Sequence, residues 1–323
     1  MAYITGTVTG SGINDAASGH KMLLAAFNTF VTTGLGSGQN WTIKRNAVAT
    51  VVSTGTNIEY IWQAPGLSGA EQIFMGLKAY QDPTADYYNL EIGVFTGYVS
   101  GNSFENQAGS SPIVGATLWN QSIQYWFVAD GQRGIIVAKF SDIYEMIYIG
   151  KYLPYATPSQ YPYPVYAFGS LANIGLLTRY SADLWWSSSN TYLGISASTY
   201  NGSNYPTPYG YMILSGFKGT SISSFLRDPA GLWLMPDIYP YAGITQIRNT
   251  ASLSSSSVGY YSLHSIVISD KSPNVYGEFS GLYYITGFNN AVENTIVISG
   301  ITYICFRDRR LTGFNDFIAL RLS

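Results

Sequence analysis

Apolar residues near the N-terminus recur with the period of an α-helix. They lie three and four residues apart, at Leu23, Ala26, Phe27 and Phe30. This spacing places them on one face and predicts a short amphipathic helix. Asn14 or Asp15 is expected to cap the start of the helix, and Gly34 is expected to end it.

After residue 40 the pattern changes to the short apolar and alternating runs that are typical of β-strands. Such runs lie at 41–43, 58–62, 71–80, 87–95, 125–129, 133–139, 183–186, 209–217, 259–269, 278–286, 294–306 and 316–322. Turn residues separate the runs, as in sandwiches and barrels. The sequence therefore predicts a mainly β fold, an antiparallel β-sandwich of one large or two consecutive sandwich-like domains, with one short N-terminal α-helix.

The clearest local signal is a β-hairpin. The runs 125–129 and 133–139 flank Asp130 and Gly131. Asp-Gly is preferred at the centre of a type I′ turn because both central residues need a positive φ. We therefore predict a two-residue hairpin turn at these residues.

Four prolines lie between residues 152 and 168, and proline lacks the backbone donor that the interior of a sheet needs. No central strand is expected in this segment, whose tyrosines favour an ordered, extended chain packed on a surface. The segment gives the best division of the chain, into an N-terminal helix plus β-sandwich domain at 1–160 and a second β-rich domain at 161–323. The alternative is an arm that crosses one continuous β domain or reaches a neighbour.

Charged residues make up only 11% of the 323 residues, where about 25% is usual for a soluble domain. The chain instead contains 28 Tyr and 34 Gly, which favour strands, tight turns and uncharged polar surfaces. The net charge is -2, without a long run of either sign. We therefore expect no direct role in nucleic-acid binding.

Few residues offer catalytic or metal-binding chemistry. Cys305 is the one cysteine, and its apolar surroundings predict a buried, inert thiol. His20 and His264 are the only histidines, and both are expected at ordinary surface positions. Without a nucleophile or metal-binding motif, we expect no catalytic residues, no cofactor and no metal. The N-terminus lacks a signal-peptide pattern and no apolar run is long enough to span a bilayer, so we expect a protein folded in a cytoplasm without membrane contact.

Tyrosine and arginine supply the candidate interface residues, because both residue types concentrate binding energy at protein interfaces. The candidates are Tyr155, Tyr161, Tyr163, Arg307, Arg309 and Arg310. The arginines belong to the densest charge cluster of the chain, at 307–310, and guanidinium groups match carboxylates in intersubunit ion pairs. A solvated turn at the end of a hairpin is an equally strong interpretation of that cluster.

Two other functions remain open. In a carbohydrate- or receptor-binding module, exposed aromatic rings would contact sugars. The candidates for such contacts are Trp185, Trp186, Tyr205 and Tyr209. In a glycan-degrading enzyme two carboxylates would act, and the nominated pairs are Glu278 with Glu293 and Asp228 with Asp237. The enzyme is the weakest interpretation, since 18 acidic residues give many accidental pairs.

A set of stretches spread along most of the chain carries a family resemblance. They are DYYNL at 86–90, FTGY at 95–98, YWF at 125–127, DGQR at 130–133, VAK at 137–139 and LPYATPSQYP at 153–162. MAYITG at 1–6 with the early helix, GE at 277–278 through GF at 287–288, and ENT at 293–295 add to them. In this order they resemble a family of tailed-bacteriophage virion structural proteins, which is associated with the tail, baseplate or neck of the particle.

The resemblance implies a non-enzymatic structural protein and brings no catalytic residues with it. We hypothesise a ring or sleeve of identical subunits that contacts other virion proteins through Tyr-rich, low-charge surfaces around a tail or neck. Such a protein would be synthesised in the host cytoplasm and located in the virion. A host-surface glycan is a partner only in the carbohydrate-binding alternative.

Overall fold

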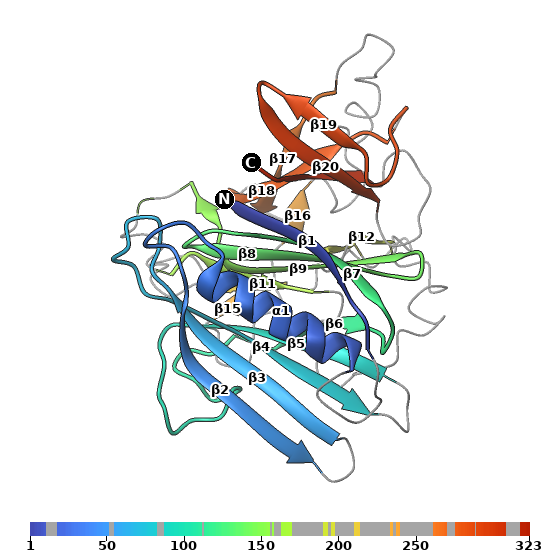
Figure 1. Cartoon of the computed structure of the whole chain (residues 1–323). Coiled ribbons are helices and arrows are strands. Elements are labelled where there is room, and N and C mark those ends of the chain that lie inside the picture. Colours follow the sequence, from blue (N-terminus) through green and yellow to red (C-terminus); the bar gives the residue numbers. More distant parts are fainter. Residues whose placement is uncertain are drawn as a thin grey trace, which may run out of the picture.

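The computed structural model describes residues 1–10, 18–51, 55–82, 87–111, 113–155, 157, 163–169, 190–192, 195–197, 210–213, 233–234, 237–239, 261–269, 275–287, 289–307 and 317–323. These residues form antiparallel sheets and one helix (Figure 1). The chain is therefore mainly β and sandwich-like with one short N-terminal α-helix, which confirms the fold class expected from the sequence.

Sheet A collects strands from distant parts of the chain. In order across the sheet, its described strands are β1 (Ala2–Val8), β7 (Ile123–Ala129), β8 (Arg133–Phe140), β9 (Ile143–Lys151), β11 (Val165–Phe168), β14 (Gly210–Ile213) and β15 (Trp233–Leu234). All neighbours pair antiparallel. β1 pairs with β7 along its whole length and lies at one edge of the sheet.

The remaining sheets are more local in sequence. Sheet B is an antiparallel meander of β2 (Thr42–Val51), β3 (Gly55–Ala64), β4 (Ile73–Asp82), β5 (Tyr87–Phe95) and β6 (Val114–Leu118). Sheet C runs in the order β16 (Asp237–Tyr239), β17 (His264–Ser269), β18 (Val275–Ile285), β21 (Phe317–Arg321), β20 (Ile301–Arg307) and β19 (Thr295–Ile298), and the short β10 (Leu153–Pro154) also pairs with β18. β12 (Asn190–Tyr192) and β13 (Ile195–Ala197) form a separate pair.

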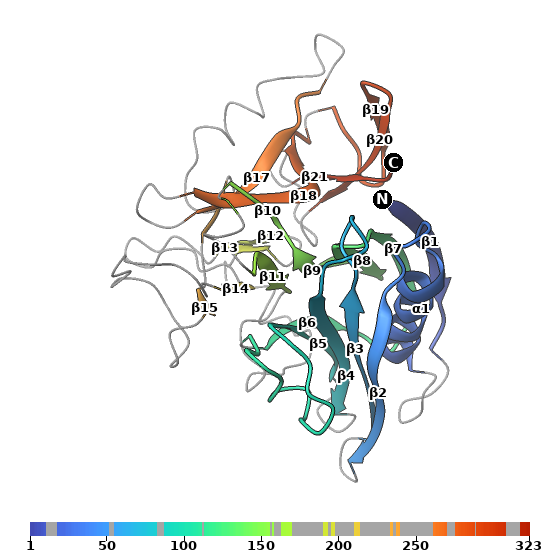
Figure 2. The ribbon, with the colours of Figure 1, turned by 90° about the vertical axis from the view of Figure 1, so that its left-hand side faces the viewer.

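Sheet A is the middle of three layers, with sheet B on one side and sheet C on the other (Figure 2). Successive residues of a strand point to opposite faces, so the strands of sheet A supply both cores. Phe127 and Ile136 belong to the core shared with sheet B, whereas Trp126 and Val137 belong to the core shared with sheet C. β8 and β9 are consequently buried along nearly their whole length, as expected for strands covered on both faces.

The helix α1 (Gly19–Thr33) packs against the core between sheets A and B (Figure 1). Leu23, Phe27 and Phe30 are buried there, and Ala26 is partly buried, as the apolar pattern predicts. Gly34 ends the helix, and its N–H donates to the Phe30 carbonyl at 2.8 Å.

The predicted start of α1 is wrong. The helix begins at Gly19 with Ser18 as its N-cap residue, while Asn14 and Asp15 lie outside the described residues. Ser18 makes no side-chain cap hydrogen bond; the Gly19 N–H is instead satisfied by the side-chain carbonyl of Asn120 at 3.1 Å. A cap supplied from 101 residues away cannot be found from local sequence.

The predicted hairpin is confirmed by the pairing of β7 with β8, but the predicted type I′ turn is wrong. The Asp130 N–H donates to the Arg133 carbonyl at 3.0 Å, so the central residues are Gly131 and Gln132, and neither has a positive φ. The Asp130 carboxylate accepts hydrogen bonds from the N–H groups of Gln132 and Arg133 and stabilises the turn. Close packing explains the glycine, because a Cβ at Gly131 would lie 2.2 Å from the Gly66 carbonyl oxygen.

The proline-rich segment differs from its prediction at its end. β11 begins directly after Pro164 and is an inner strand of sheet A, between β9 and β14. The expectation of no central strand is wrong there because four residues without proline follow Pro164 and are free to pair. Strands from both sides of residue 160 share sheet A, and the residues at the expected boundary, 158–162, lie outside the description. The division into 1–160 and 161–323 stays a prediction.

Candidate functional site

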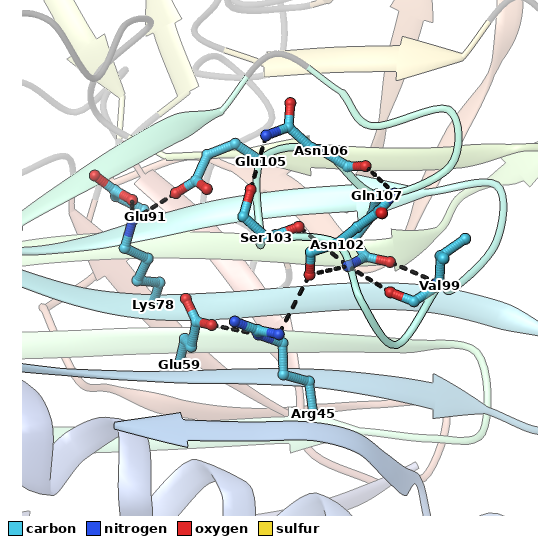
Figure 3. A network of polar contacts seen from close by, with 10 residues as sticks. All are labelled: Arg45, Glu59, Lys78, Glu91, Val99, Asn102, Ser103, Glu105, Asn106 and Gln107. Carbon is cyan, nitrogen blue, oxygen red and sulfur yellow. Dashed lines mark hydrogen bonds and ion pairs between the residues drawn. The ribbon is translucent and has the colours of Figure 1, made fainter. Parts of the chain in front are cut away.

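A network of charged side chains lies on the outer face of sheet B (Figure 3). Glu59, Lys78 and Glu91 are neighbours across β3, β4 and β5 in the strand register. The Lys78 Nζ lies 3.1 Å from the Glu91 carboxylate and 2.5 Å from the carboxylate of Glu105, which belongs to the loop after β5. Arg45 on β2 forms an ion pair with Glu59. Cations and carboxylates therefore alternate from strand to strand, in the order Arg45, Glu59, Lys78 and Glu91.

Residues 96–111 connect β5 to β6 without a helix or strand, and we call them the Gln107 loop. The Gln107 side chain is buried and bonds only to backbone: its Oε1 accepts from the Val99 N–H at 2.8 Å, and its Nε2 donates to the carbonyls of Val99, Asn102 and Ser103 at 3.0 to 3.2 Å. Arg45 also donates to the Asn102 carbonyl, which fastens the loop to β2. A loop of this length that is ordered by its own side chains is typical of an Ω-loop.

The underside of the Gln107 loop is apolar. The ring of Phe104 packs over Gly76, where a Cβ would lie 2.6 Å from it, and meets the ring of Phe95 edge to face at 5.5 Å. These residues form a small core with Ile61, Phe74 and Ile113. The outer tip, by contrast, carries exposed Val99, Ser100 and Gly101, which are uncharged. The loop thus packs its apolar side on sheet B, exposes uncharged residues at 99–101, and carries one charge, Glu105, which is paired with Lys78.

Burial and charge act in opposite directions on the titrating groups beneath this loop. Burial raises the pKa of Glu91, and the Lys78 charge offsets only part of that effect. Burial also raises the pKa of Glu105, but hydrogen bonding and charge from Lys78 outweigh it, so this pKa is lowered overall. Burial lowers the pKa of Lys78, but Glu91 and Glu105 outweigh it and hold the ammonium charged. Because Lys78 contacts both carboxylates, the network is arranged to fasten the loop to the sheet.

A second polar cluster lines a pocket of about 200 Å³ between sheets A and B. Its walls include Glu71, Gln72, Lys151 and Tyr163. The Glu71 carboxylate accepts from Lys151 at 2.5 Å and from Gln132 of the hairpin turn at 2.9 Å. Burial raises the pKa of Glu71, but these two hydrogen bonds and the Lys151 charge outweigh it and keep the carboxylate ionised.

Tyr155 is held in a defined position on the surface. Residues 153–154 pair with β18, and the Tyr155 N–H continues this pairing to the Tyr276 carbonyl at 3.0 Å. The Tyr155 hydroxyl donates to the Glu278 carboxylate at 2.7 Å, and burial together with Glu278 raises the pKa of Tyr155 to about 12. Leu153 and Tyr155 are 47% and 56% exposed, and we call them, with Glu278, the β10 surface.

The other predicted interface residues lie elsewhere. Tyr163 precedes β11 and lines the pocket, and Arg307 ends β20, where its guanidinium donates to the Asp142 carbonyl at 3.5 Å. Tyr161, Arg309 and Arg310, and the candidate glycan contacts Trp185, Trp186, Tyr205 and Tyr209, lie outside the described residues. Their roles stay predictions.

The nominated acids have separate partners. Glu278 binds Tyr155, whereas Glu293 accepts from Lys139 at 2.5 Å and from Tyr144 at 2.6 Å. Asp228 lies outside the described residues, as does the side chain of Asp237. Cys305 is buried as predicted, and burial raises its pKa to about 11 despite a hydrogen bond from Asn290.

Sequence reasoning missed the Gln107 loop and the pocket cluster. Lys78 and Glu91 were visible as charges inside otherwise apolar strands, which is the signal that marks an outward-facing position. Their pairing depends on the register of three strands, and the contacts of Gln132 and Lys151 with Glu71 span 61 and 80 residues. No local pattern encodes those contacts.

In comparisons with known proteins, no family model matches the chain and no curated protein matches its sequence. Within the described residues, no helix is long and apolar enough to cross a membrane. No group of three or more His, Cys, Asp or Glu side chains in that part of the chain is placed to hold a metal ion.

Proposed function

We propose that this chain is a non-enzymatic structural component of a tailed-phage virion, located in the tail, baseplate or neck and assembled from identical subunits. The observation that carries the proposal is the β10 surface. It presents Leu153 and Tyr155 on a strand that is fixed to sheet C by backbone pairing and by the bond from Tyr155 to Glu278. An exposed aromatic side chain held in place loses little entropy on binding, which favours a docking role.

The charged groups support the same proposal. Glu71, Glu105 and Glu293 each bind a lysine, so these ion pairs hold loops and strands of the subunit together. On the β10 surface, the exposed residues Leu153 and Tyr155 are uncharged. The order of sequence motifs that resembles phage virion proteins supplies the remaining support.

The proposal is tested genetically in the phage that encodes the chain. A nonsense mutation early in the gene, grown in a host without a suppressor, should give particles arrested at the tail, baseplate or neck. A Tyr155→Ala and Leu153→Ala double variant should lower the yield of complete particles, while the matched exposed control Leu67→Ala should not. Complete, infectious particles from the nonsense mutant would contradict the proposal.

One observation favours carbohydrate binding as a second candidate function. Tyr163 lines the pocket beside Glu71, Gln72 and Lys151, which sets an aromatic ring next to hydrogen-bonding groups. If the pocket binds a host-surface glycan, a glycan array should show binding that Tyr163→Phe retains and Tyr163→Ala loses. Binding to no glycan on the array would remove this candidate.

A further inference from the structure

Two strands at the ends of their sheets are exposed and uncharged. β1 ends sheet A and β19 ends sheet C (Figure 2). Tyr3 and Ile4 of β1 are 52% and 43% exposed, and Val297 of β19 is 67% exposed. The two sequences, AYITGTV and TIVI, contain neither a charge nor a proline. Each strand thus offers an open row of backbone donors and acceptors beside exposed β-branched side chains.

The other sheet ends with described side chains are protected. β2 carries Lys44 and Arg45, β10 contains Pro154, and β6 is buried along its length. Charges, proline and covering are the devices by which proteins keep edge strands from pairing with other chains. Among the sheet ends whose side chains are described, β1 and β19 lack these devices, which favours pairing of these two strands with another chain.

We infer that β1 of one subunit pairs with β19 of the next, so that sheet A of one copy continues into sheet C of its neighbour. The inference rests on the proposed function, because a ring or sleeve of identical subunits needs a contact between two different surfaces. Each copy carries two such surfaces, the open edge of β1 and the open edge of β19. An isologous pair, β1 with β1 or β19 with β19, would instead close a dimer and stop the ring.

The side chains fit this pairing. Thr5 is exposed at the middle of β1, and Val297 is exposed within β19. Facing β-branched residues on adjacent strands stabilise antiparallel pairs, and no like charges meet across this contact. Added strands lie about 4.8 Å apart, so residues on β1 and on β19 of the neighbour come within reach of a short cross-linker.

Cysteine cross-linking of the purified full chain tests the inference. The native Cys305 is buried, so it contributes no background. Three single variants are prepared: Thr5→Cys, Val297→Cys and the edge control Thr42→Cys on β2. Each variant is treated with a short bismaleimide by itself, and each pair of variants is treated as an equal mixture. We expect a mixture of T5C and V297C to form cross-linked dimers, and we expect each variant alone, and each mixture with T42C, to stay uncross-linked.

The outcomes separate the alternatives. Cross-linking of T5C alone or of V297C alone would overturn the inference in favour of two-fold pairing. Assemblies that form without a T5C–V297C cross-link would overturn the inference and leave the proposed function standing, and so would a chain that stays monomeric and uncross-linked at every concentration tested. Absence of the chain from virions would remove the proposed function without changing the cross-linking result.

A charge variant gives an independent readout. Thr5→Lys places a charge on the open edge of β1 and should abolish the self-association that we expect of the wild-type chain in light scattering, while Val48→Lys on the already charged β2 should leave it unchanged. Circular dichroism checks that both variants fold. Association retained in T5K would contradict the inference.

Discussion

His20 is a residue whose position in α1 differs from the prediction. It is fully buried, so its predicted surface position is wrong. Its ring meets Tyr88 at 5.6 Å, and neither ring nitrogen has a hydrogen-bond partner among the described residues. His20 lies three residues before Leu23 and seven before Phe27, on the same face of α1. The helical period therefore predicts a buried position for His20, whereas the surface prediction followed the polar residue type.

The burial of His20 makes stability depend on pH. Burial, with a smaller contribution from Lys21, lowers the pKa of His20 to about 3 from 6.5. The unfolded chain takes up a proton below pH 6.5 and the native chain does not, so stability falls as the pH drops through this range. Between pH 7.5 and 5 this group should remove about 2 kcal/mol of unfolding free energy.

Urea unfolding of the His20→Leu variant at the two pH values measures this effect. The variant should lack most of the pH dependence of the wild-type protein, and His264→Leu should retain most of it. An H20L variant that loses as much stability as the wild-type protein between pH 7.5 and 5 would show that His20 is not the cause.

Gly150 on β9 is a second residue whose identity is set by its surroundings. Its φ is 115°, and a Cβ there would lie 2.4 Å from the Gln132 carbonyl oxygen. Gly150→Ala should lower the unfolding free energy by about 3 kcal/mol through strain and overpacking. Gly36→Ala, at a position with open space around it, is the control and should change it by less than about 0.5 kcal/mol. Equal stability of the two variants in urea would disprove this account.

At the scale of elements, β8 was predicted because its hairpin turn marks it, whereas β9, which is buried on both faces like β8, was not predicted. β9 was passed over because Tyr144, Met146 and Tyr148 face one core while Ile143, Ile147 and Ile149 face the other. A strand that is apolar on both sides lacks the alternation on which the prediction depends. The hairpin of β7 and β8 was found because its turn is local, and the exact turn was missed because contacts with Gly66 and Gln39 reshape it.

The Gln107 loop carries a prediction at this scale. Gln107→Ala removes a buried side chain that makes hydrogen bonds to four backbone groups of the loop and takes away the partner of the Val99 N–H, so we expect a loss of about 2 kcal/mol of stability. Hydrogen exchange should rise in residues 96–111 before the rest of sheet B. Asn106→Ala, which removes one exposed hydrogen bond to Ser103, should leave exchange in the loop nearly unchanged. If Gln107→Ala raised hydrogen exchange in residues 96–111 no more than Asn106→Ala does, the anchoring role of Gln107 would be contradicted.

At the scale of the whole molecule, the class and antiparallel pairing of the fold followed from the sequence, while its three-layer arrangement did not. The layers depend on which face of sheet A meets which sheet, and that is decided by packing between residues such as Trp126 and Phe306, whose ring centroids lie 4.9 Å apart across 180 positions of the chain. Of the predicted interface, the β10 surface is the part that the structure positions in detail. Glu278 and Glu293 have separate partners, and the pair Asp228 and Asp237 stays a prediction because it lies outside the described side chains.

The low charge of the chain predicts how its assemblies respond to salt. Contacts made by backbone pairing and aromatic burial are screened little by ions. Sedimentation of the purified assembly should therefore change little when salt is raised from low to moderate concentration. Dissociation over that range, with circular dichroism unchanged, would show that ion pairs dominate the contacts instead.

The central claim is that this chain is built into the virion in many copies. Quantitative mass spectrometry of gradient-purified particles of the phage that encodes it tests that claim most directly. The account predicts the chain in a fixed, multiple-copy ratio to the known tail proteins of the particle. Its absence from the particles, with the chain found only in the soluble lysate, would contradict the account.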